Sequence, residues 1–178
     1  MPFSPFPELT TDRLRLRRTL ASDAEAIFFL RSDPAVNALV KRSAPKTLAD
    51  ASEFIRLRQL DITNEKMLYW SISLKDDPTM IGSICLWNFS KDKQLAEVGY
   101  DLHTDFHQQG IMNEAMEVVV AYGFGPQGLD IIEAYTQNDN IGSKKLLLKN
   151  GFAQDEKRKD DHNPKNVIFV ARRAMPNP

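Results

Sequence analysis

Segments with the two-residue period of strands and segments with the 3.6-residue period of helices follow one another along the chain. Near the N-terminus, Leu14 and Leu16 alternate with three arginines, which predicts a half-buried strand. Turn residues separate the later segments. We expect strands near 13–17, 68–74, 81–89, 95–102, 131–136, 152–156 and 167–172, and helices near 22–30, 47–63, 113–123 and 141–149. Such mixing predicts an α/β or α+β fold built on a mixed sheet.

The chain has 178 residues, a length that suits one domain with its own core. We expect an extended, proline-rich arm at 1–8, the domain at 9–174 and a short tail at 175–178. Lys and Arg together number 23 and Asp and Glu 24, so the charge balance argues against a strongly basic nucleic-acid-binding domain. We therefore expect no direct binding to nucleic acid.

Export, membrane insertion and metal binding are not indicated. No apolar run reaches the ~18 residues of a transmembrane helix, and the N-terminus lacks a signal-peptide pattern. Cys85 is the single cysteine and lies in an apolar strand, which favours a place in the sheet over a nucleophile. His103 and His107 stand four residues apart without further ligands nearby, so no metal site is predicted. We expect a cytoplasmic protein without a membrane partner.

A strand, a glycine-bearing loop and a helix occur in succession from residue 95 to residue 123. Gly110 lets the backbone approach a ligand closely, and the free N–H groups of a helix start favour an anion such as phosphate. Taken alone, this feature is better explained as an ordinary turn. A second polar helix start follows, where Asn138 or Asn140 can cap the helix and, with Ser143, also face a ligand.

Seven short motifs follow one another along almost the whole chain. They are Leu-Thr-Thr-Asp-Arg-Leu-Arg-Leu-Arg at 9–17, Ser-Asp-Ala at 22–24, Ile-Gly-Ser-Ile at 81–84, Ala-Glu-Val-Gly-Tyr at 96–100, Gly-Ile-Met-Asn-Glu-Ala at 110–115, Asn-Ile-Gly-Ser at 140–143 and Asn-Gly-Phe at 150–152. Each is weak alone, but their order and spacing are specific. The sequence resembles the acetyl-CoA-dependent N-acetyltransferases of the GNAT superfamily, in particular the RimJ/RimL-like branch that acetylates ribosomal-protein N-termini.

The resemblance implies a mixed sheet of six to seven strands, flanked by about four helices and splayed between its fourth and fifth strands, here 95–102 and 131–136. In the family the pantetheine arm of the coenzyme lies in that gap. The implied contacts of the arm are Tyr100, Asp101 and Leu102, and those of the pyrophosphate are the backbone groups of Gln108, Gln109, Gly110, Ile111, Met112 and Asn113. Asn138, Asn140 and Ser143 complete the predicted coenzyme contacts. The loop departs from the superfamily at His107, where Gln or Arg is usual, so a side-chain role there stays open.

The resemblance also implies catalytic roles. Glu97 stands where many superfamily members carry a glutamate base on the fourth strand, with a paired or solvated strand carboxylate as the equal alternative. Asp160 or Asp161 could replace it or bind the acceptor. The position of the superfamily's general-acid tyrosine is Leu147 here. Ser143 is therefore the predicted proton donor to the departing thiolate, or a ligand to its sulfur, with helix capping as the alternative.

We predict an acyltransferase that moves an acetyl group from acetyl-CoA, its cosubstrate, to a primary amine by direct attack in a ternary complex. The expected acceptor is the N-terminal α-amine of a protein, ribosomal or other. One alternative is an enzyme for a small amine, such as a polyamine, an amino acid or an antibiotic. Another is a coenzyme-A-binding module without catalysis. The chain is expected to be a monomer or a homodimer that needs no metal.

Overall fold

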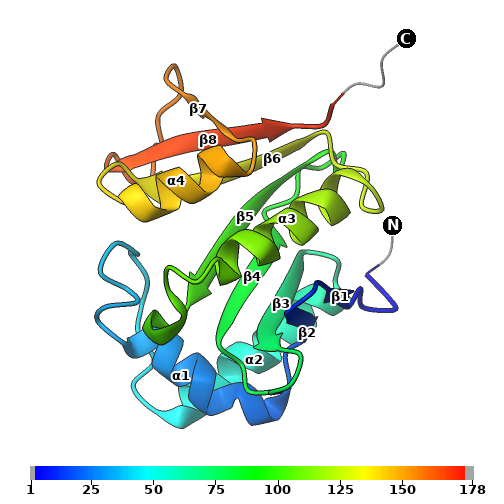
Figure 1. Ribbon diagram of the computed structural model, residues 1–178, viewed down its shortest axis with the longest axis vertical. Coiled ribbons are helices and arrows are strands. Elements are labelled where there is room, and N and C mark those ends of the chain that lie inside the picture. The colour runs from blue at the N-terminus through cyan, green and yellow to red at the C-terminus, as the bar shows by residue number, and fades with distance from the viewer. Residues whose placement is uncertain (1–2, 175–178) are drawn as a thin grey trace.

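The structure is a computed structural model that describes residues 3–174, and these contain one mixed sheet and four α-helices (Figure 1). The predicted tail at 175–178 and the first two residues of the predicted arm lie outside the described residues. The strands are β1 (Leu9–Thr10), β2 (Leu14–Arg18), β3 (Met67–Leu74), β4 (Gly82–Trp87), β5 (Leu95–Leu102), β6 (Ile131–Gln137), β7 (Ala153–Asp155) and β8 (Asn166–Arg172). The helices are α1 (Ala24–Ser32), α2 (Leu48–Thr63), α3 (Ile111–Phe124) and α4 (Ile141–Lys149).

The eight strands follow the order β1-β2-β3-β4-β5-β6-β8-β7. The pairing of β5 with β6 is parallel and all the others are antiparallel, so the predicted mixed α/β fold is confirmed. The sheet has one strand more than the six to seven expected. The additional strand, β1, is only two residues long, which is too short to show a two-residue period.

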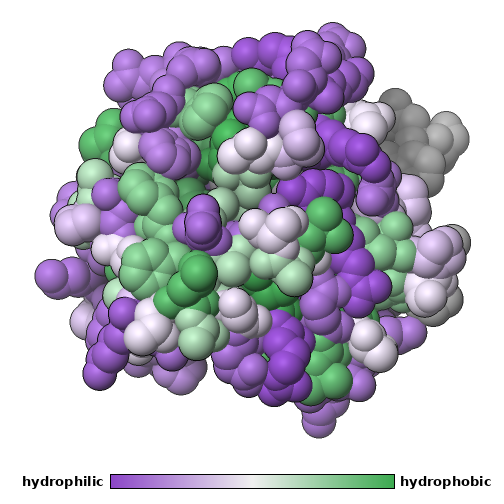
Figure 2. Space-filling view, turned by 90° about the horizontal axis from the view of Figure 1, so that it is seen from below, coloured by the Kyte–Doolittle hydropathy of each residue, from purple (hydrophilic) through white to green (hydrophobic). Residues whose placement is uncertain are grey.

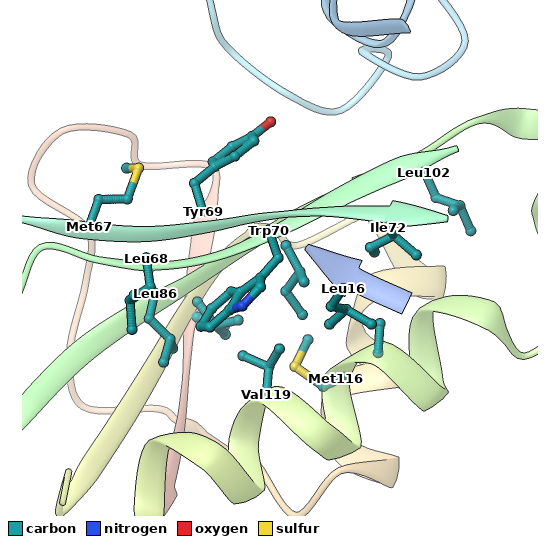
Figure 3. Close-up of a cluster of buried hydrophobic side chains, with 14 of the residues drawn as sticks. Leu16, Met67, Leu68, Tyr69, Trp70, Ile72, Leu86, Leu102, Met116 and Val119 are labelled. Carbon is teal, nitrogen blue, oxygen red and sulfur yellow. The ribbon is translucent and has the colours of Figure 1, made fainter. Parts of the chain in front are cut away.

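Two helical layers cover the two faces of the sheet (Figure 1). On one side, which we call the α3 face, Trp70 and Leu86 lie with Met116 and Val119 of α3 in a fully buried cluster (Figure 3). Tyr69 points to the opposite side, the α1–α2 face, where it meets Phe54 of α2 edge-on at 5.7 Å between ring centroids. Burial of this apolar surface on both sides supplies most of the driving force for folding.

The helix bounds agree with the prediction to within two residues, and the difference at α3 has a clear cause. We predicted a start at Asn113, but α3 begins at Ile111 because Gly110 adopts the left-handed conformation, with φ of 76°, directly before it. Few residues other than glycine adopt this conformation without strain. Within residues 3–174, no helix has both the length and the apolar character that crossing a membrane requires.

The described part of the proline-rich arm packs onto the domain. Phe3 is buried and its ring lies 5.4 Å from that of Phe89. Phe6 packs beside Trp70, whose Nε1–H donates to the Pro7 carbonyl at 2.6 Å. Residues 3–8 form no helix or strand, and their aromatic side chains extend the core.

The first long strand differs from its predicted pattern in one residue. Leu14 and Leu16 are fully buried as expected, but Arg17 is buried as well. Both of its terminal nitrogens donate to the Asp23 carboxylate, at 2.7 and 2.8 Å. The alternation of arginine with leucine could not reveal this partner, because it comes from the turn before α1.

Replacing Asp23 with asparagine should destabilise the fold strongly. The substitution keeps the size of the side chain but leaves the buried Arg17 guanidinium without a counter-charge, which costs about 3–5 kcal/mol. For a chain of this length the melting temperature should fall by roughly 6–20 °C, measured by calorimetry or circular dichroism. Glu8→Gln is the matched control, because Glu8 pairs with Arg15 at 2.9 Å where both side chains are about half exposed. Equal effects of the two substitutions would contradict this interpretation.

Candidate active site

Strands β5 and β6 diverge after a short pairing (Figure 1). The candidate active site is the part of the sheet where residues 98–102 and 134–137 are no longer paired with each other, which we call the opening. Only three register pairs join the two strands, and the last is Glu97 with Glu133. The His103 N–H donates toward β4, to the Ile81 carbonyl. Because backbone groups alternate in direction along an antiparallel strand, we infer that those facing the opening belong to Val98, Tyr100 and Leu102. The predicted splay is therefore present, with a free strand edge on β5.

The loop before α3 forms the second part of the site. Gln108 and Gly110 both have positive φ angles, 59° and 76°. Among the described residues, the backbone N–H groups from Gln108 to Asn113 find no hydrogen-bond acceptor. Together with the dipole of a fourteen-residue helix, these N–H groups would suit an anion, and the predicted phosphate contact stays a prediction.

Two side chains that the sequence left unassigned hold this loop in place. His107 donates from Nε2 to the Leu102 carbonyl at 2.9 Å, which ties the loop to the end of β5. Arg13 donates to the Gln109 carbonyl at 3.0 Å and to the Glu114 carboxylate at 2.7 Å. The loop is thus positioned by the strand before it and by the N-terminal strand pair, a contact across about a hundred residues that spacing could not indicate.

On the α3 face, a hydrogen bond joins the two sides of the opening. The Tyr100 hydroxyl of β5 lies 2.5 Å from the Ser143 hydroxyl of α4. Asn140 caps α4 by accepting the Ser143 N–H at 3.0 Å, which places the serine at the helix start. Burial raises the pKa of Tyr100 to about 12, so its phenol keeps its proton at neutral pH. Sequence analysis predicted a contact for each residue but not that the two form a pair.

Glu97 lies at the base of the opening, one residue before the free edge of β5. Its Oε1 accepts a hydrogen bond from Asn88 Nδ2 at 2.5 Å. Burial raises the pKa of Glu97, the Asn88 hydrogen bond acts in the opposite direction, and repulsion from Glu133 adds to the increase. Glu133 itself is buried and ion-paired with Arg158. Glu97 is therefore the carboxylate of this pair that lacks a cationic partner among the described residues.

Asp101 occupies a different place from the one that the resemblance implied. It accepts hydrogen bonds from Arg42 at 2.8 Å and from Ser83 at 2.6 Å, on the α1–α2 face. Because backbone groups alternate in direction along β5, the N–H and carbonyl of Asp101 point toward β4 and away from the opening. A contact with a pantetheine arm in the opening is thus not favoured, and Asp101 anchors the segment after α1 to the sheet.

The remaining polar candidates have mostly structural contacts. Asn138 accepts Lys144 Nζ at 3.0 Å, and the Asn113 side chain bonds to Glu117 and to Asn150 of the α4 end. Gln109 donates from its side chain to the Asp105 carbonyl at 2.7 Å. The side chains of Asn138, Asn113 and Gln109 therefore stabilise the ends of helices and the loop before α3.

The alternative bases and the cysteine are less suited to catalysis than Glu97. Asp160 accepts the His162 N–H and the Asn166 amide, and despite partial burial, which acts in the other direction, these hydrogen bonds lower its pKa. Asp161 is exposed in the same loop. Burial raises the pKa of Cys85 to about 12, so it remains a thiol. Among residues 3–174, no group of three or more His, Cys, Asp or Glu side chains is placed to hold a metal ion.

Comparison with known proteins shows the family of this chain. Residues 13–153 match the acetyltransferase (GNAT) domain family. The chain belongs to the GNAT acetyltransferases. An uncharacterized N-acetyltransferase of Bacillus subtilis (strain 168), YoaA, is 33% identical over 150 residues, which are 84% of this chain and 85% of that protein. As a GNAT member, the protein is an acetyl-CoA-dependent N-acetyltransferase.

Solved structures of other GNAT acetyltransferases share the fold. The ribosomal-protein-S5-alanine acetyltransferase of Vibrio fischeri superposes with a TM-score of 0.81 at 19% identity, covering 97% of this chain and 100% of that one. RimL, a ribosomal L7/L12 alpha-N-protein acetyltransferase in complex with coenzyme A, gives 0.76 at 16% identity, covering 93% of this chain and 98% of that one. At these identities the comparison establishes the fold of this GNAT protein and not its acceptor.

Proposed function

We propose that this acetyltransferase acetylates the N-terminal α-amine of a protein or peptide by direct attack of the amine in a ternary complex. The observation that carries the proposal is the position of Glu97 at the base of the opening, on the face away from α3. There burial raises the pKa of Glu97, the Asn88 hydrogen bond acts in the opposite direction, and Glu97 has no ion-pair partner among the described residues. The names of similar folds, which include acetyltransferases of ribosomal-protein α-amines, support the same acceptor.

The strength of this base favours an α-amine over a lysine side chain. An amine attacks only in its neutral form, and the pKa is about 7.7–8.0 for an α-amino group but about 10.4 for lysine. Near pH 7 roughly a tenth of α-amines are neutral, against under a thousandth of lysine side chains. A site without a strong base therefore works best on the amine that has already lost its proton.

Acetyl-CoA supplies the acetyl thioester. The loop before α3 suits its pyrophosphate, and the edge of β5 suits its pantetheine arm. The N–H groups from Gln108 to Asn113 would bind its pyrophosphate, and the free edge of β5 would pair with the amides of its pantetheine arm. In this proposal the backbone at Tyr100 and Leu102 polarises the thioester carbonyl. Glu97 takes the amine proton from the α1–α2 side.

On the α3 face, the Tyr100–Ser143 pair is the proposed proton donor to the leaving thiolate. Both hydroxyls keep their protons at neutral pH. In this proposal Ser143 gives its proton to the thiolate, Tyr100 replaces it through the short hydrogen bond, and water returns the proton to the Tyr100 phenolate before the next turnover. The acid and the base then act from opposite faces of the sheet, so the attacking amine and the leaving thiolate do not compete for one group.

Removal of either hydroxyl should slow turnover by about 100-fold, the lower range for general-acid catalysis. If Tyr100 and Ser143 act as one unit, Tyr100→Phe combined with Ser143→Ala should cost little more than either change alone. Steady-state kcat values at saturating acetyl-CoA would show this. If the loss of kcat in the double variant equals the product of the two single losses, the residues act independently, and the paired-donor role is wrong.

Acceptor profiling tests the proposed function. A short peptide with a free N-terminal Ala, Ser or Met should gain one acetyl group at its α-amine, located by tandem mass spectrometry. The same peptide with a blocked N-terminus and an internal lysine should react far more slowly. Faster acetylation of a polyamine or an aminoglycoside than of any peptide would overturn the protein acceptor. Coenzyme binding without turnover of any amine would leave only a binding module.

A further inference from the structure

We propose that Arg31 selects acceptors that carry a carboxylate a few residues away from the reacting amine. This inference rests on the proposed function, because it concerns the acceptor side of the same site. Arg31 lies at the end of α1, on the α1–α2 side of the sheet. Seen from the side of α1 and α2, the surface carries hydrophobic patches broken by hydrophilic residues (Figure 2). Arg31 borders a groove lined also by Lys46, Asp50, Glu53, Phe54 and Leu57.

The Arg31 guanidinium is held in place by an aromatic ring and not by an acid. Its central carbon lies 4.1 Å from the centroid of the Phe54 ring, a cation–π contact. Phe54 in turn packs edge-on against Tyr69 of the sheet, so the platform under the guanidinium is rigid. Such a platform fixes one side of the planar group and leaves its N–H edge for a ligand.

Arg31 differs in this respect from the two arginines beside it. Arg42 is paired with Asp101 at 2.8 Å, and Arg58 with Asp61 at 2.7 Å. In residues 3–174 the guanidinium of Arg31 has no hydrogen bond or ion pair, although the residue is partly buried. Burial, and then repulsion from Arg42, lowers the pKa of Arg31, while the charge of Asp101 acts in the opposite direction. The opposite charge of a bound carboxylate would offset both effects.

The two acids of the groove do not supply that partner. Asp50 accepts the N–H groups of Lys46 and Thr47 at 2.8 and 2.9 Å, as part of the N-cap of α2. Glu53 forms two hydrogen bonds with Arg56 on the exposed side of the helix. Both carboxylates are therefore engaged in contacts within α2 or at its N-terminal cap, and neither pairs with Arg31.

The sheet offers a direct route from Arg31 to the opening. Tyr69, which supports Phe54, is in register with Cys85 of β4, and Cys85 with Gly99 of β5. Two strand spacings of ~4.8 Å separate Tyr69 from Gly99, about 10 Å in all. Arg31 lies beyond Tyr69, against the Phe54 ring, and is close enough to β5 for the charge of Asp101 to act on its pKa. An extended peptide advances ~3.3 Å per residue and a glutamate side chain adds to that reach, so a carboxylate within the first few residues could reach Arg31 while the α-amine lies at the opening. The carboxylate of a small amino acid is the other source of this chemistry.

Peptides of matched size that differ only in the charge of their side chains test the inference. The wild-type chain should acetylate an Ala-Glu-Glu peptide with a kcat/KM roughly 10- to 100-fold above that of its Ala-Gln-Gln counterpart, the range for a hydrogen-bonded charge pair. Arg31→Gln should remove this preference through the KM of the acidic peptide, with the rate on the neutral peptide kept. Arg56→Gln, which removes the same charge from an exposed position on α2, is the matched control and should retain the preference.

Two further experiments complete the test: a variant with reversed charge at Arg31, and free amino acids as small acceptors. Arg31→Glu should prefer an Ala-Lys-Lys peptide over the acidic one, which a merely structural role of Arg31 would not produce. A free amino acid preferred over its amide, with no preference among peptides, would support carboxylate selection but contradict the peptide acceptor. Equal kcat/KM for the two peptides and for the amino acid and its amide would overturn the inference, even if α-amines are acetylated as proposed.

Discussion

Replacing Glu97 with glutamine should lower the rate of acetyl transfer by roughly 100- to 10,000-fold, the range for loss of a general base. The substitution keeps the size of the side chain and a hydrogen-bond partner for Asn88, and removes the carboxylate. Affinity for acetyl-CoA should stay the same, since the proposed coenzyme contacts lie on β5 beyond Glu97 and on α3. Measurement of kcat together with the dissociation constant of acetyl-CoA separates these two effects.

The pH profile gives a second readout for Glu97. A base works only when it is deprotonated, so activity should be lost as pH falls through the pKa of Glu97. That pKa is raised by burial, with repulsion from Glu133 adding to the increase. The acidic limb should therefore lie above the ordinary range of a glutamate and disappear in Glu97→Gln. An unchanged rate with the limb intact would move the role to Asp160, Asp161 or bulk water. Loss of folding would show that Glu97 is structural.

Gly110→Val should abolish stabilisation of the fold by acetyl-CoA. At a concentration 100-fold above its dissociation constant, a ligand stabilises the folded state by ~2.7 kcal/mol. For a chain of this length that corresponds to a rise in melting temperature of about 5–10 °C. Valine strains the left-handed conformation at residue 110 and adds a branched side chain to the loop whose N–H groups would bind the pyrophosphate. Differential scanning fluorimetry with and without acetyl-CoA measures the shift.

The chain contains a matched control for this experiment. Gly128 has nearly the same backbone angle, a φ of 77°, and a side chain there would meet open space. Gly128→Val therefore introduces the same strain in the turn after α3, away from the opening, and should lower the melting temperature but keep the shift. A normal shift in Gly110→Val, or an equally strong shift with NAD in the wild type, would contradict the coenzyme assignment.

Local patterns were sufficient to predict most of the fold. The alternation of Leu14 and Leu16, the apolar run of β3 and the polar start of α4 each indicate an element from a few neighbouring residues. What they could not predict depends on partners far away in the chain. β1 is a strand only because Leu9 lies beside Leu16, and Arg17 is buried only because Asp23 is there to pair with it.

The same distinction holds for the candidate site. The loop at Gly110 was predictable because a left-handed glycine before a helix depends on residues within one turn. The Tyr100–Ser143 pair and the fastening of the loop by Arg13 join residues that are distant in sequence. The family resemblance implied a coenzyme contact for Asp101, but adjacent strand residues face opposite ways, and the Asp101 side chain pairs with Arg42 on the α1–α2 face.

A crystal structure of this chain with acetyl-CoA would show where the coenzyme binds. We expect pyrophosphate oxygens within hydrogen-bond distance of the N–H groups from Gln108 to Asn113. We also expect the pantetheine arm between β5 and β6, with the thioester carbonyl near the backbone at Leu102 and the sulfur near Tyr100 and Ser143. An arm that lies outside this opening, or phosphates bound away from the start of α3, would contradict this expectation.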